Sequence, residues 1–414
     1  MKRLVACFLV LSVSILGGYL ILTLWRGVSL YLGIPSEENL LRATRFTPLN
    51  PNPYYRLGLY YQLSIEGRDL NQSLHYLKEA IERDPFDQRY WLTLAKALSR
   101  MGETKSSEAA IERALFVFPT GYTGRWTAAN LFLQQDDFEK ALLHFSYILA
   151  NYPDRSNMVY EVLFRTGQDP DFILDRVVPA NPSSFNQYLS YLYEIGDRQA
   201  ATEAWARKVS LGYRSDRAET LRHIDFLISG GALNEASRVW RSRLKEEGLP
   251  VPSDGNLITN GDFEREKMLG GGFDWKIIPA PGVSILFDPS VVFSGKKSLK
   301  IRFDGKGNVD FHHVYQFVSW EPNKDYLLRA EMKTQGLTTK SGIKMEVVGV
   351  GPGLQAASEP LTGDNGWRDV TIAFHTPGQS QGGIVRLRRE RTDKFDRFIS
   401  GSAWLDNVQL TEKR

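Results

Sequence analysis

The sequence predicts a chain of three parts: one membrane-spanning helix, an all-α solenoid of helical repeats and an all-β sandwich. Three observations lead to this prediction. Residues 4–25 carry no charged side chain. Prolines recur at a fixed spacing of 34 residues, at Pro51, Pro85, Pro119 and Pro153. After residue 255 the chain changes to short runs of alternating apolar and polar residues, separated by Gly, Asn, Asp and Pro.

The first part is expected to cross a membrane once. At ~1.5 Å per residue a helix over residues 4–25 reaches about 33 Å, enough for a hydrocarbon core of ~30 Å. The run is longer than the ~7–15 apolar residues of a signal peptide, and Leu24-Trp25-Arg26 offers no small-residue cleavage site, so an uncleaved signal anchor is favoured over a cleaved signal. Lys2 and Arg3 place residues 1–3 in the cytoplasm and the bulk of the chain in the periplasm or outside the cell, at a bacterial inner membrane.

Composition excludes several classes of protein. The formal net charge of +3 is too small to indicate a nucleic-acid partner. Cys7 is the single cysteine, so neither an intramolecular disulfide nor a cysteine-cluster metal site is possible. The sequence has no glycine-rich phosphate loop, no His-Glu-x-x-His and no nucleophile elbow, so we expect no enzyme.

The second part, residues 36–248, is expected to consist of stacked helix pairs. A fixed period of 34 residues indicates units that bury their apolar faces only against their neighbours. Small or apolar residues recur five, eight and twenty-four positions before each proline, on two helices per unit. The repeats are clear to Pro153 and degenerate after it, where Gly196 with Trp205 and Gly230 with Trp240 indicate two further units.

These repeats resemble the tetratricopeptide family. The resemblance rests on Trp91-Leu92-Thr93-Leu94-Ala95, on the turn at Met101-Gly102 and on the helix that ends at Asp84-Pro85. It implies a concave groove, lined by the first helix of each unit, that receives a protein partner. The groove residues expected from the proline register are Tyr55, Gln62, Arg89, Lys96, Arg100, Asn130 and Gln134. Lys96 and Arg100 could receive a carboxylate, or this helix face could simply be solvated.

The third part begins after a linker at residues 249–255, and residues 256–414 are expected to form the sandwich. Its opening Asn260-Gly261-Asp262-Phe263-Glu264, its Gly366-Trp367 and its closing Trp404-Leu405-Asp406-Asn407-Val408 resemble the carbohydrate-binding modules of the galactose-binding-like jelly-roll group. The resemblance implies a possible structural calcium ion on Glu264 and Asp406. Carboxylate oxygens suit Ca²⁺, but both residues could equally be turn formers.

The same resemblance implies that aromatic and polar side chains on one sheet face hold a poly- or oligosaccharide. The candidates are Gln316, Tyr315, His313, Trp320, Arg386 and Arg388, each of which could instead be a core or solvent-facing residue. Residues 386–397 hold six basic and three acidic side chains, which would suit an acidic polysaccharide or a lipid phosphate, or a charged hairpin in water.

The resulting hypothesis is a non-catalytic, membrane-anchored envelope scaffold whose solenoid binds a protein and whose sandwich binds a glycan, in the assembly or export of an exopolysaccharide or another surface polysaccharide. One alternative is an assembly factor that binds only proteins. Another is a cryptic glycoside hydrolase, for which Glu331 and Glu346 are the candidate carboxylates.

Overall fold

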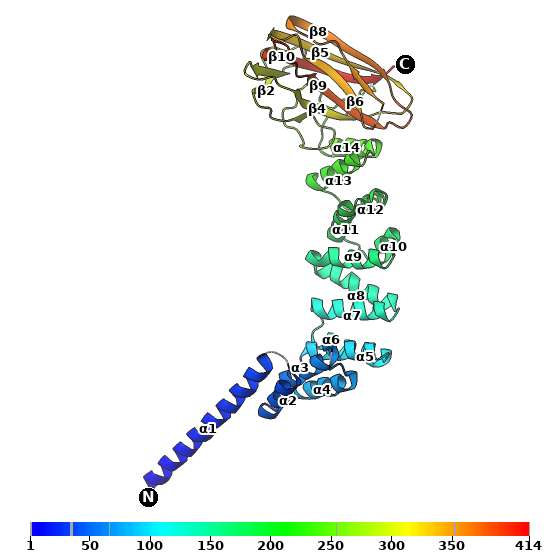
Figure 1. Cartoon of the computed structure of the whole chain (residues 1–414). Coiled ribbons are helices and arrows are strands. Elements are labelled where there is room, and N and C mark those ends of the chain that lie inside the picture. The colour runs from blue at the N-terminus through cyan, green and yellow to red at the C-terminus, as the bar shows by residue number, and fades with distance from the viewer. Residues whose placement is uncertain (1, 34–35, 66, 254, 352, 414) are drawn as a thin grey trace. The chain divides into compact units, whose positions relative to one another are not determined.

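The computed structural model describes residues 2–33, 36–65, 67–253, 255–351 and 353–413. Met1 and Asp254, which belong to the expected N-terminal segment and linker, lie outside the described residues. The chain divides into two compact units, Met1–Tyr213 and Arg214–Arg414. Helices run through the first unit, and strands dominate the second (Figure 1).

The first unit starts with the apolar helix α1 (Lys2–Leu32). Its residues Cys7–Leu32 are long and apolar enough to cross a membrane, as a signal sequence would also be. The helices that follow are α2 (Glu37–Phe46), α3 (Pro51–Leu63), α4 (Leu70–Arg83), α5 (Gln88–Arg100), α6 (Thr104–Val117), α7 (Tyr122–Gln134), α8 (Phe138–Asn151), α9 (Ser156–Arg165), α10 (Pro170–Arg176), α11 (Pro182–Ile195) and α12 (Arg198–Ser210).

The 34-residue period corresponds to the pairs α3–α4, α5–α6 and α7–α8, which pack as helical hairpins. Pro85 and Pro119 follow the ends of α4 and α6, and Pro153 starts a short 3₁₀ turn after α8. Each proline stops the second helix of its pair because it has no N–H to donate. The recurring small residues Ala80 and Ala114 are fully buried.

The second unit is a sandwich of two five-stranded antiparallel sheets together with the helices α13 (Arg217–Ser229) and α14 (Leu233–Glu246). Sheet A has the order β1-β4-β9-β6-β7, and its strands are β1 (Lys276–Ile277), β4 (Phe311–Ser319), β9 (Gly382–Arg389), β6 (Lys344–Gly349) and β7 (Gln355–Ala357). Sheet B has the order β2-β3-β10-β5-β8, and its strands are β2 (Val283–Asp288), β3 (Ser298–Asp304), β10 (Ser400–Glu412), β5 (Asp325–Leu337) and β8 (Gly363–His375).

The last helical pair packs on the sandwich, so the unit boundary precedes the linker predicted at residues 249–255. Trp240 of α14 shares a buried cluster with Leu269, Phe273 and the partly buried Phe317 of β4. Its indole Nε1 donates to the hydroxyl of Thr259 at 3.2 Å. Trp240 therefore joins α14 to the sandwich, a contact that the repeat pattern did not indicate.

Candidate functional site

The outer face of sheet A carries the candidate glycan-binding residues that reach the surface. Along β4, Val314, Gln316 and Val318 are buried, whereas Tyr315 and Phe317 are half-buried on the outer side. This alternation follows from the period of two in a strand. The phase of β4 therefore decides which of the predicted residues can touch a ligand.

A single row of side chains crosses sheet A at Tyr315. The register pairs Lys276 with Tyr315, Tyr315 with Arg386, Arg386 with Glu346, and Glu346 with Ala357. Since strands lie ~4.8 Å apart, four steps give a row about 19 Å long. An aromatic ring beside charged groups in such a row has the chemistry that a sugar requires, because the ring covers its C–H face and the charged groups bind its hydroxyls.

Arg386 is held in place by an ion pair. Its Nε donates to Oε2 of Glu346 at 2.6 Å, and Nε2 of Gln355 donates to the other carboxylate oxygen at 2.9 Å. Burial alone would raise the pKa of Glu346, but the hydrogen bonds from Gln355 and Arg386 outweigh it, so this pKa is lowered. Glu346 stays ionised, and it fixes the guanidinium, which carries further N–H donors besides Nε. Sequence reasoning named Glu346 only as a possible hydrolase carboxylate.

Arg388 and His313 flank this row on the side of the Phe311 end of β4. Nη1 of Arg388 donates to the carboxylate of Asp310 and to the carbonyl oxygens of Phe311 and Arg389. Burial, followed by the charge of His312, lowers the pKa of His313. Arg388 is therefore largely committed to bonds within the protein, while His313 remains a half-buried neutral ring at neutral pH.

Gln316 and Trp320 do not lie on the outer face, contrary to the expectation for these two residues. Gln316 is 0% exposed, and its side-chain amide both accepts from N–H of Thr259 and donates to its carbonyl oxygen, each at 2.8 Å. Trp320 is 2% exposed and donates from Nε1 to the hydroxyl of Ser380. Both side chains face the core because they share the phase of Val314 and Val318, so their polar atoms stabilise the fold.

The opposite end of the sheet A face is covered by the chain's own helices. α14 contacts β4, and Figure 1 shows α14 next to the sandwich. A side chain at Gly382 would collide with Leu233 of α14, and only about 10 Å³ of space remains among Trp240, Ser319 and their neighbours. That is about the smallest space that holds one water molecule, so this end is closed. A ligand on sheet A would therefore use the half that contains Tyr315 and Arg386.

Glu264 and Asp406, the two residues expected to hold calcium, both accept hydrogen bonds from one loop, residues 293–297. Oε1 of Glu264 accepts from N–H of Lys296 and Lys297. Oδ2 of Asp406 accepts from N–H of Phe293 and Ser294. Burial raises the pKa of Asp406, and the charge of Glu264 adds to the shift. Within the part of the chain that the structure describes, no group of three or more His, Cys, Asp or Glu has the arrangement of a metal site.

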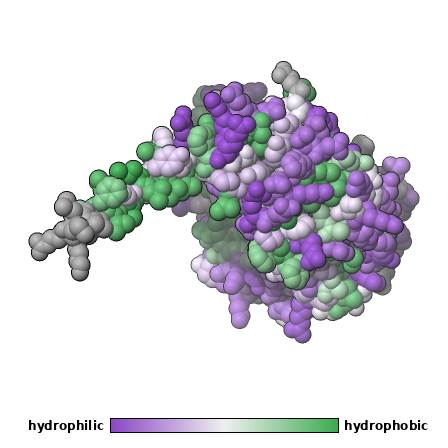
Figure 2. All heavy atoms as spheres, turned by 90° about the horizontal axis from the view of Figure 1, so that it is seen from below, coloured by the Kyte–Doolittle hydropathy of each residue, from purple (hydrophilic) through white to green (hydrophobic). Residues whose placement is uncertain are grey.

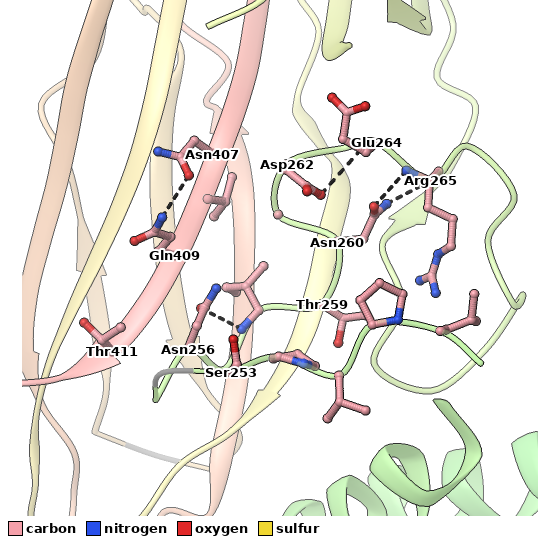
Figure 3. A pocket seen from close by; sticks show the side chains of 17 residues that line it. Ser253, Asn256, Thr259, Asn260, Asp262, Glu264, Arg265, Asn407, Gln409 and Thr411 are labelled. Atoms are coloured by element: carbon pink, nitrogen blue, oxygen red, sulfur yellow. Dashed lines mark hydrogen bonds between the residues drawn. The ribbon is translucent and has the colours of Figure 1, made fainter. Parts of the chain in front are cut away.

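A hollow of about 660 Å³, lined by both polar and apolar side chains, has Glu264 in its wall. Figure 3 shows Asn407, Gln409 and Thr411 of β10 on one side of it, and Asp262 and Glu264 of the opening segment on the other. Many of its polar groups serve the fold. For example, Oδ1 of Asn256 accepts from N–H of Ile258 and Leu410, which ties the opening segment to β10.

In the solenoid, the predicted groove residues all lie on first helices: Tyr55 and Gln62 on α3, Arg89, Lys96 and Arg100 on α5, and Asn130 and Gln134 on α7. Lys96, Arg100, Arg89 and Gln134 are exposed, and Tyr55 and Asn130 are half-buried.

Gln62 is the exception, since it is buried between α3 and α5 rather than in a groove. It is 3% exposed, and its Nε2 donates to the carbonyl oxygen of Thr93 at 3.4 Å. Nη1 of Arg100 donates to the carbonyl oxygen of Gln62. Lys96 and Arg100 lie one turn apart on α5 and place two basic side chains side by side. Partial burial lowers the pKa of Lys96, and the positive charge of Arg100 lowers it further.

No family model and no curated protein matches this chain. Solved structures similar to the β-sandwich include a "Family 16 Carbohydrate Binding Module-2" (21% identity, 38% of this chain and 100% of that chain, TM-score 0.27) and the "Xylan-Binding Domain from CBM 22" (14%, 39% and 97%, TM-score 0.26).

A solved structure similar to the helical part is that of a tetratricopeptide repeat protein from Parabacteroides merdae (15% identity, 53% of this chain and 87% of that chain, TM-score 0.28). At such identities a likeness concerns the fold alone, and these TM-scores add nothing to the argument about function. The function is therefore argued from the residues of this chain.

Proposed function

We propose that this protein is a membrane-anchored, non-catalytic scaffold of the cell envelope. Its sandwich binds a glycan through the open half of sheet A, and its helical repeats bind a protein partner. The process it serves is the assembly or export of a surface polysaccharide. The observation that carries the glycan part is the row of Lys276, Tyr315 and Arg386, in which an aromatic ring stands beside a guanidinium oriented by Glu346.

The contacts of α1 with the solenoid support the anchor. Its last two turns pack against the solenoid, because Gly27 is buried against Thr47 and the guanidinium of Arg56 donates to the carbonyl oxygen of Tyr31. Cleavage after the apolar run would remove these contacts. Anchoring is tested by extracting membranes with alkaline carbonate, which leaves only integral proteins in the pellet.

The exposed pair Lys96 and Arg100 supports a protein partner that ends in, or presents, a carboxylate. Two cations one helical turn apart repel each other, and an incoming carboxylate relieves that repulsion. A pull-down with the full chain and with the Lys96→Ala/Arg100→Ala double variant should differ in one specific partner.

The absence of catalysis is part of the proposal. Glu346 projects from the outer face of sheet A and Glu331 from that of sheet B, so these two carboxylates do not flank a common site. Release of reducing sugar from any polysaccharide that the chain binds would contradict this part.

We further propose that Glu264 and Asp406 hold a structural calcium ion. The two carboxylates come from distant parts of the chain and bond the same loop. Burial raises the pKa of Asp406 and the nearby charge of Glu264 raises it further, a repulsion that a cation would relieve. When bound, the ion would offset their mutual repulsion and tie the opening segment to β10.

The glycan part is tested on the full chain in detergent, with a glycan array followed by calorimetric titration of the best array oligosaccharide. We expect Tyr315→Ala and Arg386→Ala each to weaken binding at least tenfold. Arg302→Ala is the matched control, because it removes an exposed arginine from β3 of sheet B. A folded chain that binds no glycan would instead favour the assembly factor that binds only proteins.

A further inference from the structure

We infer that a hollow between the end of α1 and the first repeat binds a phospholipid whose headgroup carries a net negative charge. This inference rests on the anchor in the proposed function and adds a ligand that the anchor alone does not require. It concerns Tyr31 and Leu32 of α1, Arg56, Leu59 and Leu63 of α3, and Arg89 of α5, which line a cavity of about 750 Å³.

The cavity exists because α1 continues beyond its uncharged stretch and packs on the solenoid. Gly27 approaches so closely that a Cβ there would lie 2.4 Å from a methyl group of Thr47. The guanidinium of Arg26 lies 5.5 Å from the ring centre of Phe46 on α2. The guanidinium of Arg56 lies 5.9 Å from the ring centre of Tyr31 and also bonds its carbonyl oxygen. These contacts hold Tyr31 and Leu32 over α3.

The cavity lies at the outer edge of the headgroup layer of a bilayer. With residues 4–25 in the hydrocarbon core, Tyr31 and Leu32 stand about 9–11 Å further along the helix at ~1.5 Å per residue. Headgroups occupy roughly 5–8 Å on each side of the core, and tilt of the helix reduces the height. Figure 2 shows apolar surface along α1, the helix whose end lines the cavity. The cavity thus opens at the outer edge of the headgroups.

The charges in the cavity favour an anion. Among the lining residues that the structure describes there is no aspartate or glutamate, and two are arginines. Arg89 forms an ion pair with Asp87. Arg56 donates to the carbonyl oxygen of Tyr31, and this neutral acceptor does not neutralise the positive charge of the guanidinium. A guanidinium fork binds a phosphate in a bidentate manner.

The apolar side chains distinguish a lipid from a free anion. Leu32 is 61% exposed and Leu63 is 62% exposed at the rim of the cavity. Ile65, two residues beyond Leu63, is fully exposed. In water these surfaces would be unfavourable, but against the glycerol and upper acyl region of a lipid they are buried. A soluble phosphate would use Arg56 and leave them exposed.

The test measures lipid retention by the full chain. Chain purified in detergent is incubated with equal amounts of phosphatidylglycerol and phosphatidylcholine, and lipid adducts are counted by native mass spectrometry. We expect the adduct with one phosphatidylglycerol to be at least threefold more abundant than the adduct with phosphatidylcholine. Millimolar inorganic phosphate should not displace the phosphatidylglycerol. Arg56→Gln should abolish this preference, and Leu59→Trp should lower total retention because the indole fills the cavity.

Arg42→Gln is the matched control. It removes an exposed arginine of α2 that pairs with Glu38 rather than facing the cavity, and it should retain the preference. Thermal melting by circular dichroism verifies that each variant is folded. Equal retention of both lipids, displacement by inorganic phosphate, or a preference that survives both cavity variants would overturn the inference, as would a dimer that buries the cavity.

Carbonate extraction separates this failure from failure of the proposed function. A chain that stays in the membrane but shows no preference for phosphatidylglycerol disproves only the lipid site. A chain found in the soluble fraction disproves the anchor, and the lipid site with it.

Discussion

Truncation of Trp240 tests whether the last helical pair belongs to the sandwich. Trp240 is 2% exposed, its ring centre lies 6.5 Å from that of Phe273, and its N–H bonds the hydroxyl of Thr259. A buried Trp→Ala change costs about 3–5 kcal/mol, because it removes apolar contacts and leaves a cavity. In a unit of about 200 residues each kcal/mol corresponds to ~2–4 °C, so the transition of this unit should fall by about 6–20 °C.

The assay is differential scanning calorimetry of the full chain, in which the two compact units are expected to melt separately. Substitutions of two fully buried residues identify the two transitions. Phe145→Ala in α8 should lower the melting temperature of the repeats, and Val385→Ala in β9 should lower the melting temperature of the sandwich. Trp240→Ala should then act on the transition that Val385→Ala lowers. Trp240→Phe should cost about 1–3 kcal/mol, as it mainly removes the indole donor.

If Trp240→Ala lowers the melting temperature of the repeats and leaves that of the sandwich unchanged, α14 does not pack as part of the sandwich. In that event α14 would belong to the repeats, and the end of sheet A that it covers would be open to ligands.

Three further predictions follow from the second unit. Gln316→Ala should destabilise the second unit by about 2–5 kcal/mol in urea unfolding, because the N–H and the carbonyl oxygen of Thr259 both lose a buried partner. If the urea midpoint is unchanged and glycan binding is lost, Gln316 belongs to the ligand site instead. The pKa of Glu346 is lower in the folded protein than in the unfolded chain, where it is ~4.5. The ionised Glu346 side chain therefore stabilises the fold above pH ~4.5, and this stabilisation is lost as the pH falls through the folded pKa. Glu346→Gln should therefore be less acid-sensitive between pH 6 and 3, and an identical pH profile would count against the ion pair. Calcium should raise the melting temperature of this unit relative to chelator, and Glu264→Gln should remove the increase; the same increase in that variant would exclude this site.

Much of the fold follows from local pattern. The helix pairs were predicted because Pro85 and Pro119 end helices by a local mechanism that needs no tertiary information. The strands of the sandwich were largely predicted because their alternation has a period of two. The short strands β1 and β7 were not predicted, because two or three residues cannot display a period. Strand β2 was not predicted either, because the apolar run Ile285-Leu286-Phe287 breaks its alternation.

The candidate site was only partly predictable. Tyr315 and Gln316 are adjacent in the sequence, and either could have faced outward. The phase is decided by the core, where Val314 and Val318 pack. Glu346 was recognised as a chemical group but not as the partner of Arg386, since this pairing depends on the register of β6 against β9.

The sequence by itself determined the apolar helix, the repeating helix pairs and the two-sheet sandwich, because charge, proline spacing and alternation act over a few neighbouring residues. Only the tertiary structure decided which surfaces are available to ligands. The closing of one end of sheet A by α14, and the cavity between Tyr31 and Arg56, both arise where side chains from distant segments pack together. Such contacts depend on the shapes of both partners, and no single stretch of sequence encodes that fit.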